Sequence, residues 1–227
     1  MGTYTAFGRN EVLARYTESR TFDGDTFDGV DLESAVLPAS RLTRASFKGV
    51  NLRRANLSDA SLVDSMVYET RLSGASLSGA AIENVRVIAS DLNETTMARA
   101  RLYRARFERC SLMNAGFAGA RILASSFPRT DLYGSELTGA YLIHVDFSDD
   151  GHGTASLIKA RLSGAVLIDV DFRHANLEGA DFSNAKMLSV NFAGANLRGV
   201  DLRGAALVNV NLDGADVHGL LRERDLV

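Results

Sequence analysis

The stretch from Asp149 to Gly153, DDGHG, holds the side chains of this sequence that are best suited to chemistry. Neighbouring carboxylates beside an imidazole are residue types that can bind a metal ion. The spacing argues against a calcium loop, because Asp146, Asp149 and Asp150 do not alternate, and no second histidine or cysteine is adjacent. A metal site is therefore the less favoured interpretation, and the pattern of the surrounding chain has to decide between a site and a loop.

No other group of residues suggests catalysis. The sequence has no nucleophile elbow, Walker loop, HExxH or CxxC motif. The four histidines stand singly, at His144, His152, His174 and His218. We expect a protein that is not an enzyme, with no catalytic, cofactor-binding or metal-binding residues. The one cysteine, Cys110, cannot form an internal disulfide.

The element that positions these residues is a repeat of five residues. A bulky apolar residue, here called a centre, recurs at every fifth position from Phe22 to Phe147 and again from Leu157 to Val217. Only His152 breaks this phase. Two residues before each centre stands a small residue such as alanine, serine or valine, and Asp150 is the one exception after Asp25. A helix would place successive centres about 140° apart and a strand would place them on opposite sides, so the chain must turn every five residues.

Residue chemistry supports this geometry. The small residue and the centre are two positions apart, so in extended backbone both point inward and the residue between them points out. Ten of the eleven phenylalanines are centres, whereas none of the six tyrosines is, because a buried phenol would lack a hydrogen-bond partner. Fifteen of the twenty glycines fall at the second corner position, where a tight turn requires positive φ. Cys110 occupies a small-residue slot and is expected to be inert packing.

This phase gives the DDGHG stretch a structural interpretation. It places Asp150 in a small-residue slot and His152 at a centre, where neither side chain is stable without a polar partner. We therefore expect a bulged or looped face, which Gly151 and Gly153 make possible. Because loops on rigid scaffolds often carry function, this loop is also a candidate for contact with a partner. If it is an insertion of one quintet, the faces beyond it are renumbered.

The quintets resemble a known family. ANLSD (Ala55–Asp59), ANLEG (Ala175–Gly179), ADFSN (Ala180–Asn184) and ANLRG (Ala195–Gly199) are similar to the A(D/N)LXX motif of pentapeptide-repeat proteins. The resemblance implies an all-β fold, a right-handed quadrilateral β-helix with four quintets per coil and about ten coils, spaced by about 4.8 Å. We expect an N-terminal cap over residues 1–19 with a short helix near Arg9–Tyr16, the β-helix over 20–219, and a C-terminal tail over 220–227.

Charged residues gather in three places. A basic belt around the middle of the rod comprises Arg99, Arg101, Arg104, Arg106 and Arg109, beside Tyr103. A solvated face is its simplest interpretation, and contact with an anion or partner is the alternative. The candidate partner contacts, all acidic except His152, lie near the start and around the loop. They are Asp23, Asp28, Asp31, Glu33, Asp146, Asp149, Asp150, His152, Asp169 and Asp171.

The C-terminal part presents apolar residues that need covering. Ile168, Leu188 and Val208 are twenty residues apart, so they should stack on one outward face, with Val166 and Ala206 beside them. The tail supplies Leu220, Leu221 and Leu226, which could fold back onto this face or pair with a second copy. Ile168, Leu188, Val208, Leu220, Leu221 and Leu226 are thus the candidate dimer or cap contacts. We expect a homodimer through this end, because an open end exposes strand edges.

Function is expected to lie in protein binding. The formal net charge of −3 gives no case for direct binding of nucleic acid or a membrane, and the start has no signal-like or membrane-spanning stretch, so we expect a cytoplasmic protein. The resemblance extends to the quinolone-resistance group, which implies a DNA mimic that binds DNA gyrase, a type II topoisomerase, and confers antibiotic resistance. The alternative is a cytosolic scaffold or regulatory adaptor that binds another protein through a rod face or the 149–153 loop.

Overall fold

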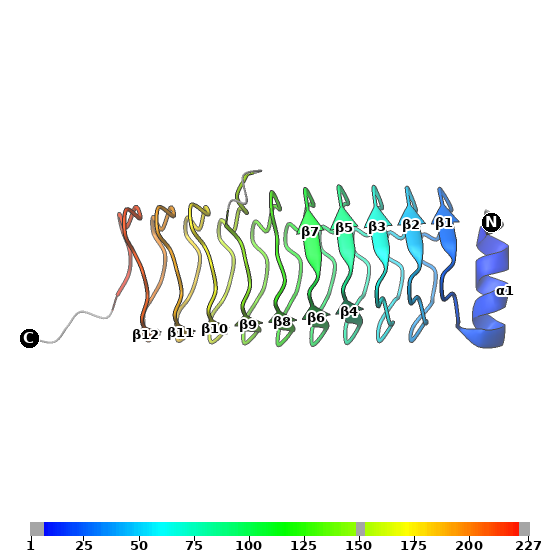
Figure 1. Ribbon diagram of the computed structural model, residues 1–227, viewed down its shortest axis with the longest axis horizontal. Coiled ribbons are helices and arrows are strands. Elements are labelled where there is room, and N and C mark those ends of the chain that lie inside the picture. The colour runs from blue at the N-terminus through cyan, green and yellow to red at the C-terminus, as the bar shows by residue number, and fades with distance from the viewer. Residues whose placement is uncertain (1–6, 149–152, 223–227) are drawn as a thin grey trace, which may run out of the picture.

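The chain winds into a long rod of stacked, four-sided coils (Figure 1). The computed structural model describes residues 7–148 and 153–222. It is a parallel β-solenoid of about nine turns, which confirms the predicted β-helix. Centres and small residues point inward along the whole rod, as in the pairs Ala55 with Leu57 and Ala175 with Leu177, all at most 2 % exposed. The outward residues between them remain partly or fully exposed, except Asn51, which is 9 % exposed.

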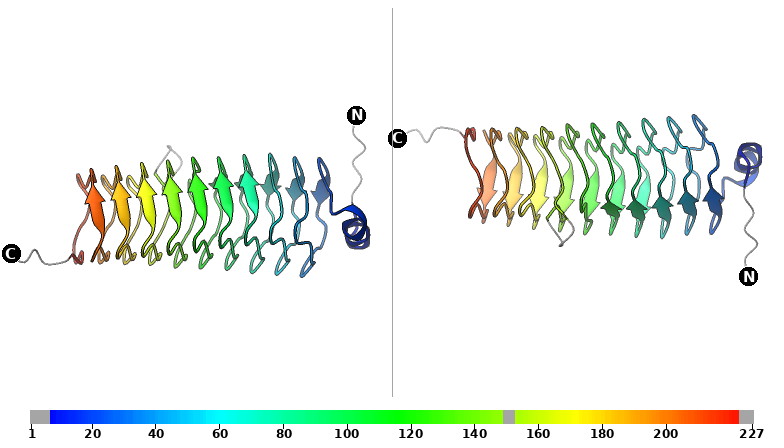
Figure 2. Two further views of the ribbon diagram at one scale, coloured as in Figure 1. Left: turned by 90° about the horizontal axis from the view of Figure 1, so that it is seen from below. Right: turned by 90° about the horizontal axis from the view of Figure 1, so that it is seen from above.

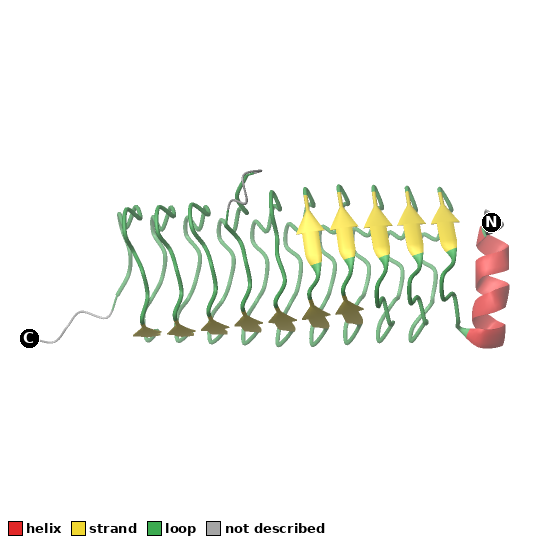
Figure 3. Cartoon of the chain, viewed as in Figure 1, coloured by secondary structure: helices red, strands yellow, loops and turns green. Residues whose placement is uncertain are grey.

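Short strands on two of the four sides form two parallel sheets (Figures 1 and 3). One sheet contains β1 (Thr26–Asp28), β2 (Ser46–Lys48), β3 (Met66–Tyr68), β5 (Arg86–Ile88) and β7 (Arg106–Glu108). The other contains β4 (Ala81–Glu83), β6 (Arg101–Tyr103), β8 (Arg121–Leu123), β9 (Tyr141–Ile143), β10 (Val166–Ile168), β11 (Lys186–Leu188) and β12 (Ala206–Val208). The remaining sides are joined by single bridges between coils.

The register shows where extra residues enter. Neighbouring coils pair twenty residues apart until Asp131 pairs with Ser156 and Glu136 with Arg161, twenty-five residues apart. In an ordinary quintet the amide of the small residue donates to the centre three residues earlier, as Ala60 does to Leu57. In the longer coil Ala155 instead donates to Phe147, at 3.3 Å. The interpretation of this stretch as an inserted loop is therefore confirmed, although residues 149–152 themselves lie outside the described part.

Aromatic stacking fills one side of the core. Phe107, Phe127, Phe147, Phe172 and Phe192 lie in one column, with ring centroids 4.9 to 5.2 Å apart. Val67 and Val87 occupy the same column nearer the N-terminus, between Phe47 and Phe107. Their smaller side chains leave a narrow apolar cavity of about 20 Å³. This part of the core is therefore less tightly filled than the aromatic part.

The two ends of the rod differ. Helix α1 (Arg9–Ser19) lies across the N-terminal end and buries Val12 against the core. Asp25 of the first coil, an acidic residue in a small-residue slot, forms an ion pair with Arg15 of this helix at 2.8 Å. Burial raises the pKa of the Asp25 carboxyl, and Arg15 partly opposes that rise. At the other end the described chain stops at Arg222 with no helix across it.

Candidate protein-interaction surfaces

The seven-stranded sheet, whose strands face the viewer in Figure 2, left, carries on its outer side a continuous apolar row, here called the ladder. Its members are the third residues of six successive strands, aligned by the strand register. They are Tyr103, Leu123, Ile143, Ile168, Leu188 and Val208. Leu188 is 44 % exposed and Val208 57 %, while Leu123, Ile143 and Ile168 are partly buried. The predicted stack of Ile168, Leu188 and Val208 is present, and it is twice as long as expected.

A second outward row runs beside the ladder on the same strands. It consists of Arg101, Arg121, Tyr141, Val166, Lys186 and Ala206. Tyr141 is 48 % exposed and Val166 is partly buried, so apolar surface continues across both rows. From β6 to β12 these two rows contain three cations and no carboxylate; Glu83 on β4 lies next to their N-terminal end. The face is therefore apolar and basic.

The acidic candidates near the start are spread over three sides of the rod. Asp23 lies on the same side as Phe22, where its carboxylate binds Arg41 at 2.7 Å. Asp28 is exposed on β1. Asp31 and Glu33 lie on the next side, and both accept hydrogen bonds from the Asn51 amide, at 2.8 and 3.2 Å.

The acidic candidates around the insertion are closer together. Asp146 and Asp171 stack in adjacent coils on the side of the five-stranded sheet. Asp171 binds Arg173 at 2.7 Å, and this carboxylate raises the pKa of the Arg173 guanidinium. Asp169 lies at a corner beside His144, 3.5 Å away. Asp149, Asp150 and His152 lie outside the described residues.

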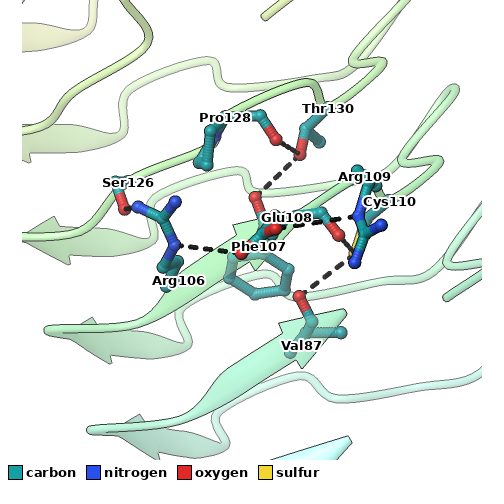
Figure 4. Close-up of polar contacts among 9 residues, drawn as sticks. All are labelled: Val87, Arg106, Phe107, Glu108, Arg109, Cys110, Ser126, Pro128 and Thr130. Carbon is teal, nitrogen blue, oxygen red and sulfur yellow. Dashed lines mark hydrogen bonds and ion pairs between the residues drawn. The ribbon is translucent and has the colours of Figure 1, made fainter. Parts of the chain in front are cut away.

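The basic belt wraps two sides and their corners within one coil. Arg101 and Arg106 lie on β6 and β7, and Arg104 lies at the corner between them with its guanidinium 4.9 Å from the ring centroid of Tyr103. Figure 4 shows Glu108 between Arg106 and Arg109, at 3.3 and 3.7 Å. The part of the belt on the five-stranded sheet is therefore partly neutralised.

Cys110 lies beneath this belt as interior packing (Figure 4). Its Sγ is 3.4 Å from the carbonyl oxygens of both Val87 and Glu108, and the residue is only 3 % exposed. Burial raises the pKa of the thiol to about 11. The protonated thiol fits a structural role better than a reactive one.

The C-terminal end exposes the cross-section of the core. The centre Leu207 of the last coil is 43 % exposed, whereas Leu167, two coils earlier on the same side, is completely buried. Leu220 packs partly against the core, and Leu221 pairs with Asp201, so coil pairing extends to Leu221. Leu226 lies outside the described residues. The end surface thus combines exposed apolar side chains with an unpaired coil edge.

Among residues 7–148 and 153–222, no group of three or more histidine, cysteine, aspartate or glutamate side chains is placed to hold a metal ion. The helix within these ranges is too short and too polar to span a membrane.

The N-terminal half of the ladder was not predicted from the sequence. A constant twenty-residue step from Ile168 leads back to Ser148, which is not on the ladder. The correct step across the insertion is twenty-five residues and leads to Ile143. The signal that could have found it is the apolar character of Leu123 and Ile143, read with the insertion removed.

Comparison with known proteins agrees with this geometry. A family model described as pentapeptide repeats matches residues 26–64, 40–79, 70–109, 110–149, 155–187 and 185–219. No curated protein matches the chain significantly.

Two solved structures illustrate the similarity. HetL, a pentapeptide repeat protein involved in heterocyst differentiation regulation in the cyanobacterium Nostoc sp. strain PCC 7120, is 24 % identical with a TM-score of 0.87, over 98 % of this chain and 99 % of HetL. QnrB1, a plasmid-mediated fluoroquinolone resistance protein, is 16 % identical with a TM-score of 0.36, over 90 % of this chain and 92 % of its own. The likeness to HetL shows the fold, and the repeat model covers most of the chain. The chain therefore belongs to the pentapeptide-repeat family.

Proposed function

We propose that this chain is a non-catalytic adaptor, a rigid cytoplasmic rod that binds another protein through one side of its coils. The observation that carries this proposal is the uncovered ladder. Six outward apolar side chains in adjacent coils form a contiguous patch, and contiguous apolar patches on soluble proteins typically mark binding sites. The absence of a disulfide-forming cysteine pair supports the proposed location.

The likeness to HetL is consistent with this role. HetL has the same fold along its whole length and is involved in regulating a differentiation process. We infer that a rod of this kind would act in regulation through its contacts with another protein. A rod with a flat, preformed binding side can make such contacts with little loss of conformational entropy.

Affinity capture with matched variants tests the adaptor function. Immobilised wild-type protein is compared with Ile168→Asp/Leu188→Asp, which places two carboxylates on the ladder. The control is Val36→Asp, because Val36 is 61 % exposed but lies on another side of the rod. We expect a partner retained by the wild type and the control and lost from the ladder variant. A variant with residues 149–153 deleted tests the loop as the contact instead, and retention by all variants would refute both contacts.

Competition with DNA for a type II topoisomerase such as gyrase is the second candidate. The stack of Asp146 above Asp171 favours it, because a row of carboxylates on a rod can imitate phosphates. The pairing of Asp171 with Arg173 weakens that field. A gyrase supercoiling assay with and without a fluoroquinolone is the test. Inhibition of supercoiling or protection from the drug, lost in Asp146→Asn/Asp171→Asn, would support mimicry, and no effect at micromolar concentration would exclude it.

We also propose that two copies associate through the C-terminal end. The exposed centres Leu207 and Val217 and the open coil edge would be covered by the same surface of a second copy. Light scattering on the full chain, on residues 1–219 and on Leu207→Asp measures the mass. A dimer that becomes a monomer in both altered proteins is expected, and a monomeric full chain would contradict the proposal.

A further inference from the structure

We infer that the ladder binds an amphipathic α-helix of a partner protein, lying along the rod, whose carboxylates pair with Arg101 and Arg121. This inference rests on the adaptor function and names the chemistry of its partner. The helix would place aliphatic side chains on Leu123, Ile143 and Ile168.

The charge of the face points to an acidic partner. Arg101 and Arg121 are register partners in adjacent strands, so two like charges lie one coil apart. Like charges directly opposite each other destabilise a sheet. Neither guanidinium forms an ion pair or a hydrogen bond with any residue that the structure describes. The pair therefore has no ion-pair partner within the described chain, and a carboxylate from outside could supply one.

A second stacked arginine pair differs from this one because the chain itself supplies a carboxylate to it. Arg86 and Arg106 are also register partners, on β5 and β7. There Glu108 lies within 3.3 Å of Arg106 and supplies a carboxylate from the chain itself. On their own strands the outward residues next to Arg101 and Arg121 are Tyr103 and Leu123. Glu83 lies diagonally across on β4, opposite Tyr103, and forms no ion pair with either arginine.

A hollow in the surface separates the arginines from the ladder. Glu83, Arg101, Leu102, Tyr103, Arg121 and Leu123 line it. Its volume is about 240 Å³, which is enough for a protruding acidic side chain. A carboxylate entering there would meet two cations, the apolar surface of Tyr103 and Leu123, and the one lining carboxylate, Glu83, so the net charge of the lining still favours an anion. Partial removal of water strengthens the ion pair.

The spacing of the coils selects a helix as the occupant. Coils repeat at about 4.8 Å, and an α-helix advances about 5.4 Å per turn. Side chains at i and i+4 are about 5 to 6 Å apart, so they match adjacent coils, whereas alternate side chains of a strand are about 6.8 Å apart and do not. Over the five steps of the ladder the helix falls out of phase by only about 3 Å, less than one repeat.

This chain does not supply such a helix from its described residues. Helix α1 lies across the N-terminal end with Val12 buried. No other helix is present among residues 7–148 and 153–222 to lie on the ladder, so we assign this place to a helix of a partner protein.

Two synthetic helices provide the probe. Both are about 18 residues long, enough to span the ladder at about 1.5 Å per residue, with a leucine stripe flanked by glutamate in one peptide and lysine in the other. Binding to the full-length protein is measured by fluorescence anisotropy. We expect the glutamate peptide to bind at least tenfold more tightly than the lysine peptide, and its affinity to fall as salt is added.

Charge reversal locates the contact. Arg101→Glu/Arg121→Glu should reduce affinity for the glutamate peptide at least tenfold and should raise affinity for the lysine peptide. Arg53→Glu/Arg71→Glu is the matched control, because both arginines are exposed on another side of the rod. Circular dichroism confirms that each variant is folded. Equal loss in the control, or no preference between peptides, overturns the inference.

The outcome separates this inference from the adaptor function. If Ile168→Asp/Leu188→Asp loses a captured partner but the glutamate peptide does not bind, the ladder is a binding face for something other than an acidic helix. If the peptide binds as expected and no partner is captured, the adaptor function fails while the chemistry of the face stands.

Discussion

Replacement of Phe147 by alanine tests whether the aromatic column holds the coils together. Phe147 is fully buried, and its ring lies 5.0 Å from that of Phe127 and 4.9 Å from that of Phe172. Burial of a phenylalanine contributes about 1.5 to 3 kcal/mol. Two stacking contacts add about 0.5 to 1.5 kcal/mol each. We therefore expect Phe147→Ala to lower the free energy of unfolding by about 3 to 5 kcal/mol, the range of other buried phenylalanines.

Urea denaturation followed by circular dichroism and tyrosine fluorescence measures this loss. Phe147→Leu is the matched comparison, because it keeps a large apolar side chain and removes only the ring. It should cost about 1 to 2 kcal/mol. The coil of Phe147 also carries the insertion, so a lowered m-value would indicate that the C-terminal coils unfold separately. A loss below about 1 kcal/mol for Phe147→Ala would refute the stacking argument.

Three further predictions concern the core and its titrating groups. Val87→Ile should raise the free energy of unfolding in urea by about 1 kcal/mol, because a methylene fills the 20 Å³ cavity, whereas Val50→Ile, in a filled small-residue slot, should not. The thiol of Cys110 should resist a thiol reagent at pH 8 until the protein unfolds. Because its pKa rises from 9.0 to about 11 on folding, stability should fall between pH 9 and 11, and Cys110→Ala should remove that fall. The hydrogen bond from Arg203 lowers the pKa of the Asp201 carboxyl. The contribution of this carboxyl to the free energy of unfolding is therefore present above the ordinary carboxyl pKa and is lost as the pH falls through the lowered pKa. An NMR titration should show that Arg203→Ala returns the pKa of Asp201 toward 3.8.

The five-residue phase was sufficient to predict the interior of the rod. A centre such as Leu57 and a small residue such as Ala55 can both be buried only if the chain turns after each quintet, so their spacing determines the geometry. The same logic identified the inserted loop, because Asp150 and His152 cannot occupy interior slots unpaired. The types and spacing of residues within each quintet therefore determine most of the fold.

Contacts between distant residues were harder to predict. The sequence marks Asp25 only as an exception to the small-residue rule, since its partner Arg15 comes from a helix whose placement on the rod end is a tertiary feature. The neutralisation of Arg106 by Glu108 and the exposure of Arg101 also depend on which side of the rod each strand occupies. Surfaces combine residues from successive coils, so one wrong step along the chain changes their membership.

The position of the insertion has a consequence for how such a rod can change length. Five residues incorporated as an ordinary side would turn every later coil by about a quarter of a revolution, and Ile168 would no longer continue the row of Ile143. Because Ala155 donates across the insertion to Phe147 and Ile168 pairs with Ile143, the five extra residues do not count as a side and the later coils keep their orientation. Duplications of whole twenty-residue turns, and insertions that leave the pairing of later coils unchanged, are thus the changes that keep a long binding side unbroken.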